Sequence, residues 1–164
     1  MADGWRRLVI GRNPRRTLVR ALVVAAAAYV FFGYVLLPAR VEGASMSPNY
    51  KTGGLTLVNA LAYVRSDPQR GDVIAIELAG RSVMLLKRVV GLPGETVSFR
   101  HGQVYVEGSP LDEPYVLFEG DWNLPPKRCG EREYYVVGDN RAMRSSAHIH
   151  GRVDRSRIVG APLW

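Results

Sequence analysis

The longest apolar stretch of the chain lies near its N-terminus, at residues 18–37, and only Arg20 interrupts it. About 20 residues at the rise of an α-helix span the hydrocarbon core of a bilayer. Residues 21–37 are apolar on every face of such a helix, so no polar stripe remains to meet water, which disfavours a soluble core helix. Pro38 follows as a helix stop. The pattern predicts one transmembrane helix at 18–38, a basic N-terminal segment at 1–17 and a further domain at 39–164.

After this helix the pattern changes to short apolar runs separated by Gly, Pro, Asp and Asn, which is typical of strands and turns. His101 and Gly102 separate two of these runs and predict a tight hairpin. No other amphipathic stretch is long enough to dominate as a helix. We therefore predict a mainly β domain, with strands at 55–59, 72–78, 82–91, 96–100, 103–107, 133–137 and 157–160.

The formal net charge of +7 is concentrated ahead of the apolar run. Before residue 21, six arginines and one aspartate give +5 (6 − 1), which leaves +2 (7 − 5) for the remaining residues. A nucleic-acid-binding protein is expected to carry its basic residues along a face of the folded domain instead. Cytoplasmic flanks of membrane helices, in contrast, are enriched in Arg and Lys. We expect the lipid bilayer as a partner and no nucleic acid. The chain is predicted to be a single-pass plasma or inner membrane protein with a cytoplasmic N-terminus and an extracytoplasmic domain.

A cleaved signal peptide is the alternative interpretation of the apolar run. Its core would be shorter and would end at a small-x-small site. Here the run is long and is followed by Pro38, Ala39, Arg40 and Val41. The sequence favours an anchor that stays attached to the domain.

Metal-binding residue types are scarce. Cys129 is the only cysteine, so the chain cannot form an internal disulfide, and we interpret it as an apolar filler. His148 and His150 could share one face of a strand and bind a metal, but no third ligand has a suitable spacing. We expect no metal and no cofactor.

Lys87 has the most unusual setting in the sequence. It lies within residues 83–90, a run that otherwise has the composition of a buried strand. A lysine at an edge strand, with its ammonium reaching water, is one explanation. The other is a general base, because a buried Lys, unlike Arg, can lose its proton. A free Lys titrates near ~10.4, and lowering that pKa by about 2 to 3 units makes the amine a usable base.

Ser45 lies a few residues after the predicted anchor, in a turn-like segment that begins at Gly43. Alone, this segment predicts only a loop. With a base nearby, the hydroxyl becomes a candidate nucleophile, and its own backbone amide is the expected oxyanion donor, since Gly43 has no side chain to offer. A Ser-His-Asp triad built from Asp139 and a histidine is the alternative, because sequence order does not forbid it, but it leaves Lys87 unexplained.

Four motifs, in order along the chain, resemble the sequence boxes of type I signal peptidases. They are Ser45-Met46-Ser47-Pro48, Arg70-Gly71-Asp72-Val73, the run Lys-Arg-Val-Val-Gly-Leu-Pro-Gly-Glu at 87–95, and Gly138-Asp139-Asn140-Arg141. The resemblance implies a signal-peptidase-like β domain behind an N-terminal anchor. It implies a membrane-bound serine endopeptidase that removes signal peptides from exported precursor proteins with a Ser/Lys dyad and without a metal.

The resemblance also assigns roles to individual residues. Ser45 attacks the scissile carbonyl, Lys87 takes its proton, and Arg88 and Asp139 support the site. The substrate is expected to bind as an added strand, with small side chains entering shallow pockets. The residues expected to bind it are Val41, Gly43, Met46, Val83 and Leu85.

The last motif departs from the family pattern. The family continues Gly-Asp-Asn-x-x-x-Ser-x-Asp-Ser-Arg, whereas this chain has Arg144, Ser145, Ser146, Ala147 and His148 from the first of those serines onward. Ser145, one residue late, is the expected replacement for the serine that hydrogen-bonds the lysine, while the customary Asp and Arg have no obvious substitute. Two alternatives stay open: a specialised processing peptidase resembling the pilin-maturing enzymes of conjugation systems, and a non-catalytic membrane-tethered β domain that binds exported proteins.

Overall fold

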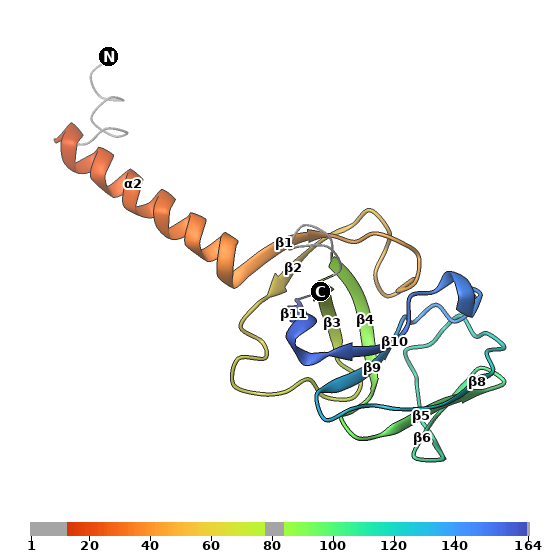
Figure 1. The fold of residues 1–164 in the computed structure, drawn as a ribbon. Coiled ribbons are helices and arrows are strands. Elements are labelled where there is room, and N and C mark those ends of the chain that lie inside the picture. Colours follow the sequence, from red (N-terminus) through yellow and green to blue (C-terminus); the bar gives the residue numbers. More distant parts are fainter. Residues whose placement is uncertain (1–12, 78–83, 164) are drawn as a thin grey trace. The chain divides into compact units, whose positions relative to one another are not determined.

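The computed structural model describes residues 13–77 and 84–163, and the chain divides into two compact units, residues 1–36 and 37–164 (Figure 1). The first unit contains helix α2 (Pro14–Val30), continued by a π-helical turn η1 (Phe31–Val35). By length and composition this helical segment could cross a membrane.

The helical bounds differ from the apolar run at both ends. The helix begins earlier because Asn13 caps it, accepting a hydrogen bond from the Arg16 amide, and because Pro14 suits the first turn. It ends at Val35, because Pro38 disfavours a helical conformation for Leu37. Residues around this proline instead form a strand. The assignment of 18–38 as a membrane span stays a prediction.

The second unit is built from two sheets, which confirms the predicted mainly β fold. The seven-stranded sheet has the order β1-β2-β11-β3-β4-β9-β10, with β1 (Leu36–Arg40), β2 (Leu55–Asn59), β3 (Val73–Glu77), β4 (Met84–Gly91), β9 (Glu133–Val137), β10 (Gly151–Asp154) and β11 (Ile158–Pro162). The four-stranded sheet has the order β7-β6-β5-β8, with β5 (Thr96–Arg100), β6 (Gln103–Val106), β7 (Ser109–Pro110) and β8 (Leu124–Arg128). Short 3-10 helices η2 (Ser145–Ala147) and η3 (Arg155–Arg157) flank β10.

The predicted hairpin is present between β5 and β6. Arg100 pairs with Gln103, so the loop has two residues, His101 at φ +47° and Gly102 at φ +79°. Two successive left-handed residues match the turn type whose twist suits a two-residue hairpin. All seven predicted strands occur, and β1, β7, β8 and β10 are additional. The predicted end at residue 78 and the predicted start at residue 82 lie outside the described residues, and the other predicted ends shift by at most two residues.

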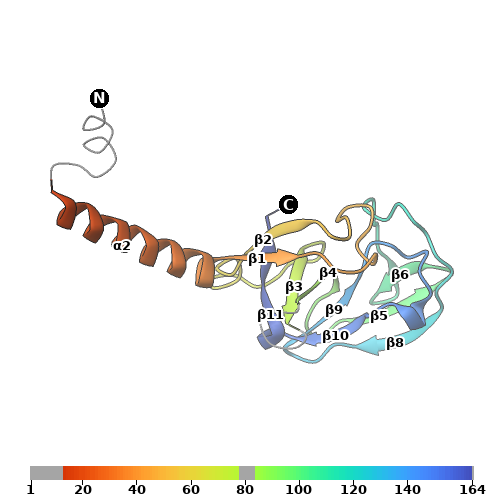
Figure 2. The ribbon, with the colours of Figure 1, turned by 90° about the horizontal axis from the view of Figure 1, so that it is seen from above.

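Strand β4 lies next to all three parts of the core. Leu86 packs into one cluster with Val41 and Met46, whereas Val89 packs into a second cluster with Ile74. The third cluster joins the two sheets, and Figures 1 and 2 both place β5, β6 and β8 together on the side of the domain away from β2 and β11. It contains Val90, Val97, Phe99, Val104, Trp122, Cys129, Tyr135 and Val137. Cys129 is buried there, in keeping with its interpretation as an apolar filler.

Candidate active site

Ser45 lies in the turn that connects β1 to β2. The turn opens at Gly43, whose φ of +85° is a conformation that favours glycine. The Thr52 hydroxyl donates to the Gly43 carbonyl at 3.0 Å. Met46 is buried in the core cluster that also contains Val41. These contacts fix the turn on both sides of Ser45, whose own side chain is only half-buried.

Lys87 is buried in the middle of β4, with 2% of its surface exposed. It lies opposite Ile74 in the β3–β4 ladder, and Ile74 belongs to an apolar cluster. Its Nζ lies 2.5 Å from the Oγ of Ser45, although 42 residues separate the two in the sequence. The structure therefore brings the two predicted chemical groups into direct contact.

Burial lowers the pKa of the Lys87 ammonium from 10.5 to about 8, while the nearby carboxylate of Asp139 acts in the opposite direction. Roughly a tenth of the molecules then carry a neutral amine at pH 7. A neutral amine at hydrogen-bond distance from a hydroxyl can accept its proton as the oxygen attacks a carbonyl carbon. The arrangement is competent for nucleophilic catalysis by a serine.

The next residue of β4, Arg88, forms a buried ion pair with Asp139. Its Nε and Nη2 donate to the two carboxylate oxygens at 2.8 and 2.6 Å, and its Nη1 donates to the Gly71 carbonyl at 2.7 Å. Asp139 is 0% exposed and also accepts a hydrogen bond from the Asn49 side chain at 2.7 Å. The ring of Tyr115 covers the guanidinium at 3.9 Å. The pair links β4 to the segment after β9 and, through Asn49, to the serine turn.

The segment after β9 packs directly against the serine turn. The Asn140 amide donates to the Ser45 carbonyl at 2.9 Å, and the Asn140 side chain donates to the Ala44 carbonyl at 3.0 Å. Gly138 fits so closely that an added Cβ would lie 2.1 Å from the Ser45 carbonyl oxygen and 2.6 Å from Nε2 of His148. The Ser45 amide makes no hydrogen bond within residues 13–77 and 84–163, so it is available as a donor.

The residues predicted to bind substrate occupy different environments. Val41 and Met46 are buried, Gly43 is exposed at the start of the turn, and Leu85 is half-buried on β4. Val83 lies outside the described residues.

Backbone pairing differs between the two segments that were predicted to bind substrate, the one at 41–43 and the one at 83–85. The Val41 amide donates to the Gly54 carbonyl at 2.9 Å, and the Val41 carbonyl accepts from the Gly53 amide at 2.8 Å. Val41 is therefore already paired. On β4, the partner β3 covers residues 84–88, whereas β9 pairs only from Arg88 onward. In the described part of the chain, residues 84–87 consequently have no strand partner on the β9 side.

Ser145 begins helix η2, and its carbonyl accepts a hydrogen bond from the His148 amide at 3.2 Å. Among the described residues its hydroxyl makes no hydrogen bond to Lys87, so its proposed role stays a prediction. Neither His148 nor His150 hydrogen-bonds Ser45, and Asp139 is occupied by Arg88. No group of three His, Cys, Asp or Glu side chains forms a metal site within the described ranges.

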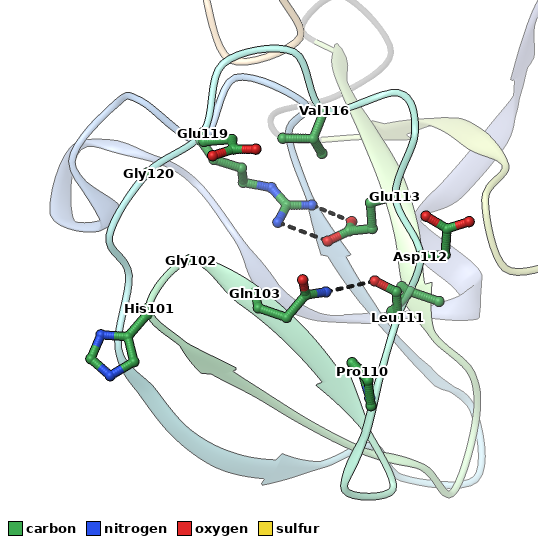
Figure 3. Close-up of a pocket in the computed structure, with 11 residues that line it drawn as sticks. His101, Gly102, Gln103, Pro110, Leu111, Asp112, Glu113, Val116, Glu119 and Gly120 are labelled. Carbon is green, nitrogen blue, oxygen red and sulfur yellow. Dashed lines mark hydrogen bonds and ion pairs between the residues drawn. The ribbon is translucent and has the colours of Figure 1, made fainter.

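One cavity has neither Ser45 nor Lys87 in its lining. Its volume is about 450 Å³, and its lining includes Asp112, Glu113 and Glu119, with Glu113 paired to the buried Arg141 at 2.5 Å (Figure 3). A smaller cavity of about 110 Å³ lies beside Leu85 and Lys87. The smaller cavity therefore adjoins Lys87, whose Nζ contacts Ser45 Oγ.

Three residues of the site received no role from the sequence: Asn49, Tyr115 and Asn140. His148 was considered only as a metal ligand or as the histidine of a triad. Asn49 directly follows the motif at 45–48, and Asn140 belongs to the motif at 138–141. Their place in or beside these motifs was the signal by which the sequence could have identified them. Tyr115 and His148 reach the site from segments without regular hydrophobic periodicity, so no pattern predicted their contacts.

Comparison with known proteins identifies the family. The family model described as signal peptidase, peptidase S26, matches residues 15–163. A probable signal peptidase I-1 of Synechocystis is 33% identical over 155 residues, covering 90% of this chain and 78% of that protein. Signal peptidase IB of Staphylococcus aureus is 28% identical over 168 residues, covering 89% of this chain and 87% of that protein. A crystal structure of a signal peptidase I from Enterococcus faecalis covers 58% of this chain and 97% of its own, with 28% identity and a TM-score of 0.45. The chain belongs to the signal peptidase family, peptidase S26, and is a serine endopeptidase that removes signal peptides.

Proposed function

We propose that Ser45 and Lys87 are the catalytic dyad of this peptidase and that its substrates are exported precursor proteins presented at a lipid bilayer. The observation that carries the proposal is the 2.5 Å contact between Lys87 Nζ and Ser45 Oγ in a buried setting. The match to the peptidase S26 family over residues 15–163 supports the substrate class.

The reaction passes two protons through the same amine, one in each half-reaction, and each proton is first taken up and then released. Ser45 Oγ attacks the scissile carbonyl carbon while neutral Lys87 takes the hydroxyl proton. The resulting ammonium then gives that proton to the departing amine, which leaves an acyl-enzyme on Ser45. Water attacks the ester, Lys87 takes the water proton, and that proton returns to Ser45 Oγ as the ester bond breaks.

The tetrahedral intermediate needs a hydrogen-bond donor for its oxyanion. The Ser45 amide is free within the described residues, and its carbonyl is held by the Asn140 amide at 2.9 Å. A backbone donor that is fixed before the reaction stabilises the developing charge without reorganising. We assign this role to the Ser45 amide.

The substrate would pair with β4. Residues 84–87 have no partner on the β9 side in the described part of the chain, and an extended peptide can add to such an edge. This placement brings the peptide past Leu85 and beside the cavity of about 110 Å³. The small volume supports a preference for small side chains. The paired backbone of Val41 makes the β1 side a weaker candidate for hydrogen bonding.

The membrane segment supports a location next to translocated precursors. Signal peptidase I family members are membrane-associated, and the helical segment Pro14–Val35 is long and apolar enough to cross a membrane. The arginines before residue 21 favour a cytoplasmic N-terminus, and with that orientation Ser45 lies on the extracytoplasmic side. The bilayer, and no nucleic acid, is then the partner of the N-terminal residues.

The test is cleavage of a secretory precursor by the full chain in detergent, with the Ser45→Ala chain as the blank. Mass spectrometry of the products should show one cut after the signal peptide, and the same protein without its signal peptide should stay intact. Precursor that stays uncut by wild type but still binds would favour the non-catalytic alternative. Cleavage of a pilin-type precursor with secretory precursors untouched would favour the specialised peptidase.

Gly138→Ala is expected to lower kcat strongly. The new Cβ would lie 2.1 Å from the Ser45 carbonyl oxygen, so either the serine turn or the segment after β9 must move. A displacement of about 1 Å at a reacting group costs roughly 100-fold in rate. Gly130→Ala is the matched control, because its Cβ would meet only the flexible Glu133 carboxylate, at 3.3 Å. Equal kcat for both variants in the precursor assay would contradict the close packing at Gly138.

A further inference from the structure

His148 is a buried histidine at the position where the family pattern has arginine. It is 5% exposed, and its Nε2 accepts a hydrogen bond from the Gly138 amide at 2.8 Å. A ring nitrogen that accepts carries no proton, so the neutral ring has its proton on Nδ1. Arginine has only donors and could not receive this hydrogen bond.

The ring of His148 is fixed by aromatic packing. Trp122 meets it edge to face, with ring centroids 4.8 Å apart. The Trp122 indole in turn donates to the Met143 carbonyl at 2.8 Å, which holds the indole in place. The acceptor nitrogen therefore has a defined position rather than a set of rotamers.

The donor of the hydrogen bond that His148 accepts, Gly138, lies close to the backbone of the nucleophile. A Cβ added at Gly138 would lie 2.1 Å from the Ser45 carbonyl oxygen, and two residues later the Asn140 amide donates to the same carbonyl at 2.9 Å. When Gly138 is held in place, the Asn140 amide is held in place as well, and so is the Ser45 backbone that it binds. The Ser45 amide, which we assign as the donor to the oxyanion, is part of that backbone. His148 does not itself contact Ser45 in the described hydrogen-bond network.

We infer that His148 is a positioning residue, which as a neutral hydrogen-bond acceptor fixes Gly138 and, through Asn140, the backbone of Ser45. This inference rests on the proposed catalytic role of Ser45. It gives the divergent last motif a specific function: a neutral acceptor replaces a charged side chain.

The surroundings of His148 keep it in the accepting form. Its charged and titratable neighbours are Lys87, His150 and Arg141, which oppose a further positive charge. Burial, followed by these cations, lowers the pKa of His148 to about 3. The ring is consequently neutral at every pH at which Lys87 can act as a base.

Three substitutions at His148 separate positioning from space filling. His148→Gln keeps an uncharged acceptor at the place of Nε2 and should retain kcat within about threefold. His148→Leu and His148→Arg lack the acceptor and should lose roughly 10- to 100-fold in kcat. KM should stay within about twofold, because His148 is buried and is not among the residues that line the cavity beside Leu85 and Lys87. In His148→Arg the added cation should also move the acid limb of the pH–rate profile to lower pH, because it favours neutral Lys87. The same changes at His101, whose side chain is 90% exposed, should leave kcat unchanged.

The measurement is steady-state cleavage of a precursor by the full chain, with thermal unfolding recorded for each variant. Glutamine and leucine variants with equal losses, or a leucine variant with wild-type kcat and only a lower Tm, would overturn the inference. Failure of both the leucine and arginine variants to fold, with the glutamine variant folded, would also overturn it in favour of a structural role. Wild type without Ser45-dependent cleavage would instead refute the proposed function.

Discussion

Lys87→Arg, Lys87→Met and Ser45→Ala are each expected to reduce precursor cleavage below detection. The 2.5 Å contact between Nζ and Oγ is useful only when the amine is neutral. Arginine stays protonated in proteins and cannot take the serine proton, and methionine has no acceptor of comparable strength. Loss of a nucleophile or its base typically removes several orders of magnitude in rate. Single-turnover cleavage measures the effect, and full activity of Lys87→Arg would disprove the general-base role.

The pH dependence of the wild-type enzyme provides an independent test of Lys87 as the general base. The pKa of Lys87 is lowered to about 8, so the neutral fraction grows about tenfold per pH unit below that value. We expect kcat/KM to rise from pH 6 to 8 with a slope near one and then to level off. A histidine base would place the midpoint about one and a half units lower, near its ordinary value of ~6.5.

Lys87→Met should also make the inactive enzyme more stable at neutral pH. Because the folded-state pKa is lowered from 10.5 to about 8, the unfolded chain binds this proton more tightly, and the buried ammonium opposes folding below pH 8. The penalty is on the order of 3 kcal/mol and disappears as the pH rises through ~10.5. Urea unfolding of wild type and Lys87→Met at pH 7 and pH 10.5 should show a gap that closes. Lys51→Met, at an exposed lysine, should show no gap at either pH.

The sequence predicted the interior of both sheets and missed their edges. The seven predicted strands correspond to β2, β3, β4, β5, β6, β9 and β11, all of which have neighbours on both sides. The four missed strands, β1, β7, β8 and β10, are the edges of the two sheets. Edge strands need no continuous apolar pattern and tolerate proline, as Pro125 and Pro126 in β8 show. Periodicity detects burial, so it detects a strand only where the strand is buried.

The site residues, too, could be predicted only where the sequence around them carries a local signal. Lys87 was identifiable because a lysine is unusual inside an otherwise apolar run. Ser45 was identifiable because it begins the first of four motifs that occur in the order found in signal peptidases. The contacts of Asn49, Tyr115 and His148 depend on loops that fold back over β4 from distant parts of the chain. Such contacts have no local signature, because a polar residue in a loop looks the same whether it faces solvent or a buried carboxylate.

Asp139→Asn is expected to lower both stability and activity. The carboxylate is 0% exposed and accepts from Arg88 at 2.8 and 2.6 Å and from Asn49 at 2.7 Å. Removing one partner of a buried ion pair leaves the other charge uncompensated and costs roughly 3–5 kcal/mol. The negative charge also raises the pKa of Lys87, so its loss should move the acid limb of kcat/KM to lower pH while the maximum falls. Asp67→Asn is the matched control: that carboxylate is 78% exposed and pairs with Arg155, so its removal should cost less than about 1 kcal/mol.

The double variant Arg88→Leu/Asp139→Leu distinguishes what the ion pair does for folding from what it does for catalysis. Apolar residues of similar volume often replace a buried ion pair with little loss of stability, because neither charge remains to be desolvated. Urea unfolding should therefore show the double variant more stable than Asp139→Leu alone. Its activity should stay low, because Asn49 has lost the carboxylate that joins the serine turn to the segment after β9. Wild-type cleavage by the double variant would show that this link is dispensable and that the Asn140 hydrogen bonds and the core packing around Met46 suffice to hold the dyad.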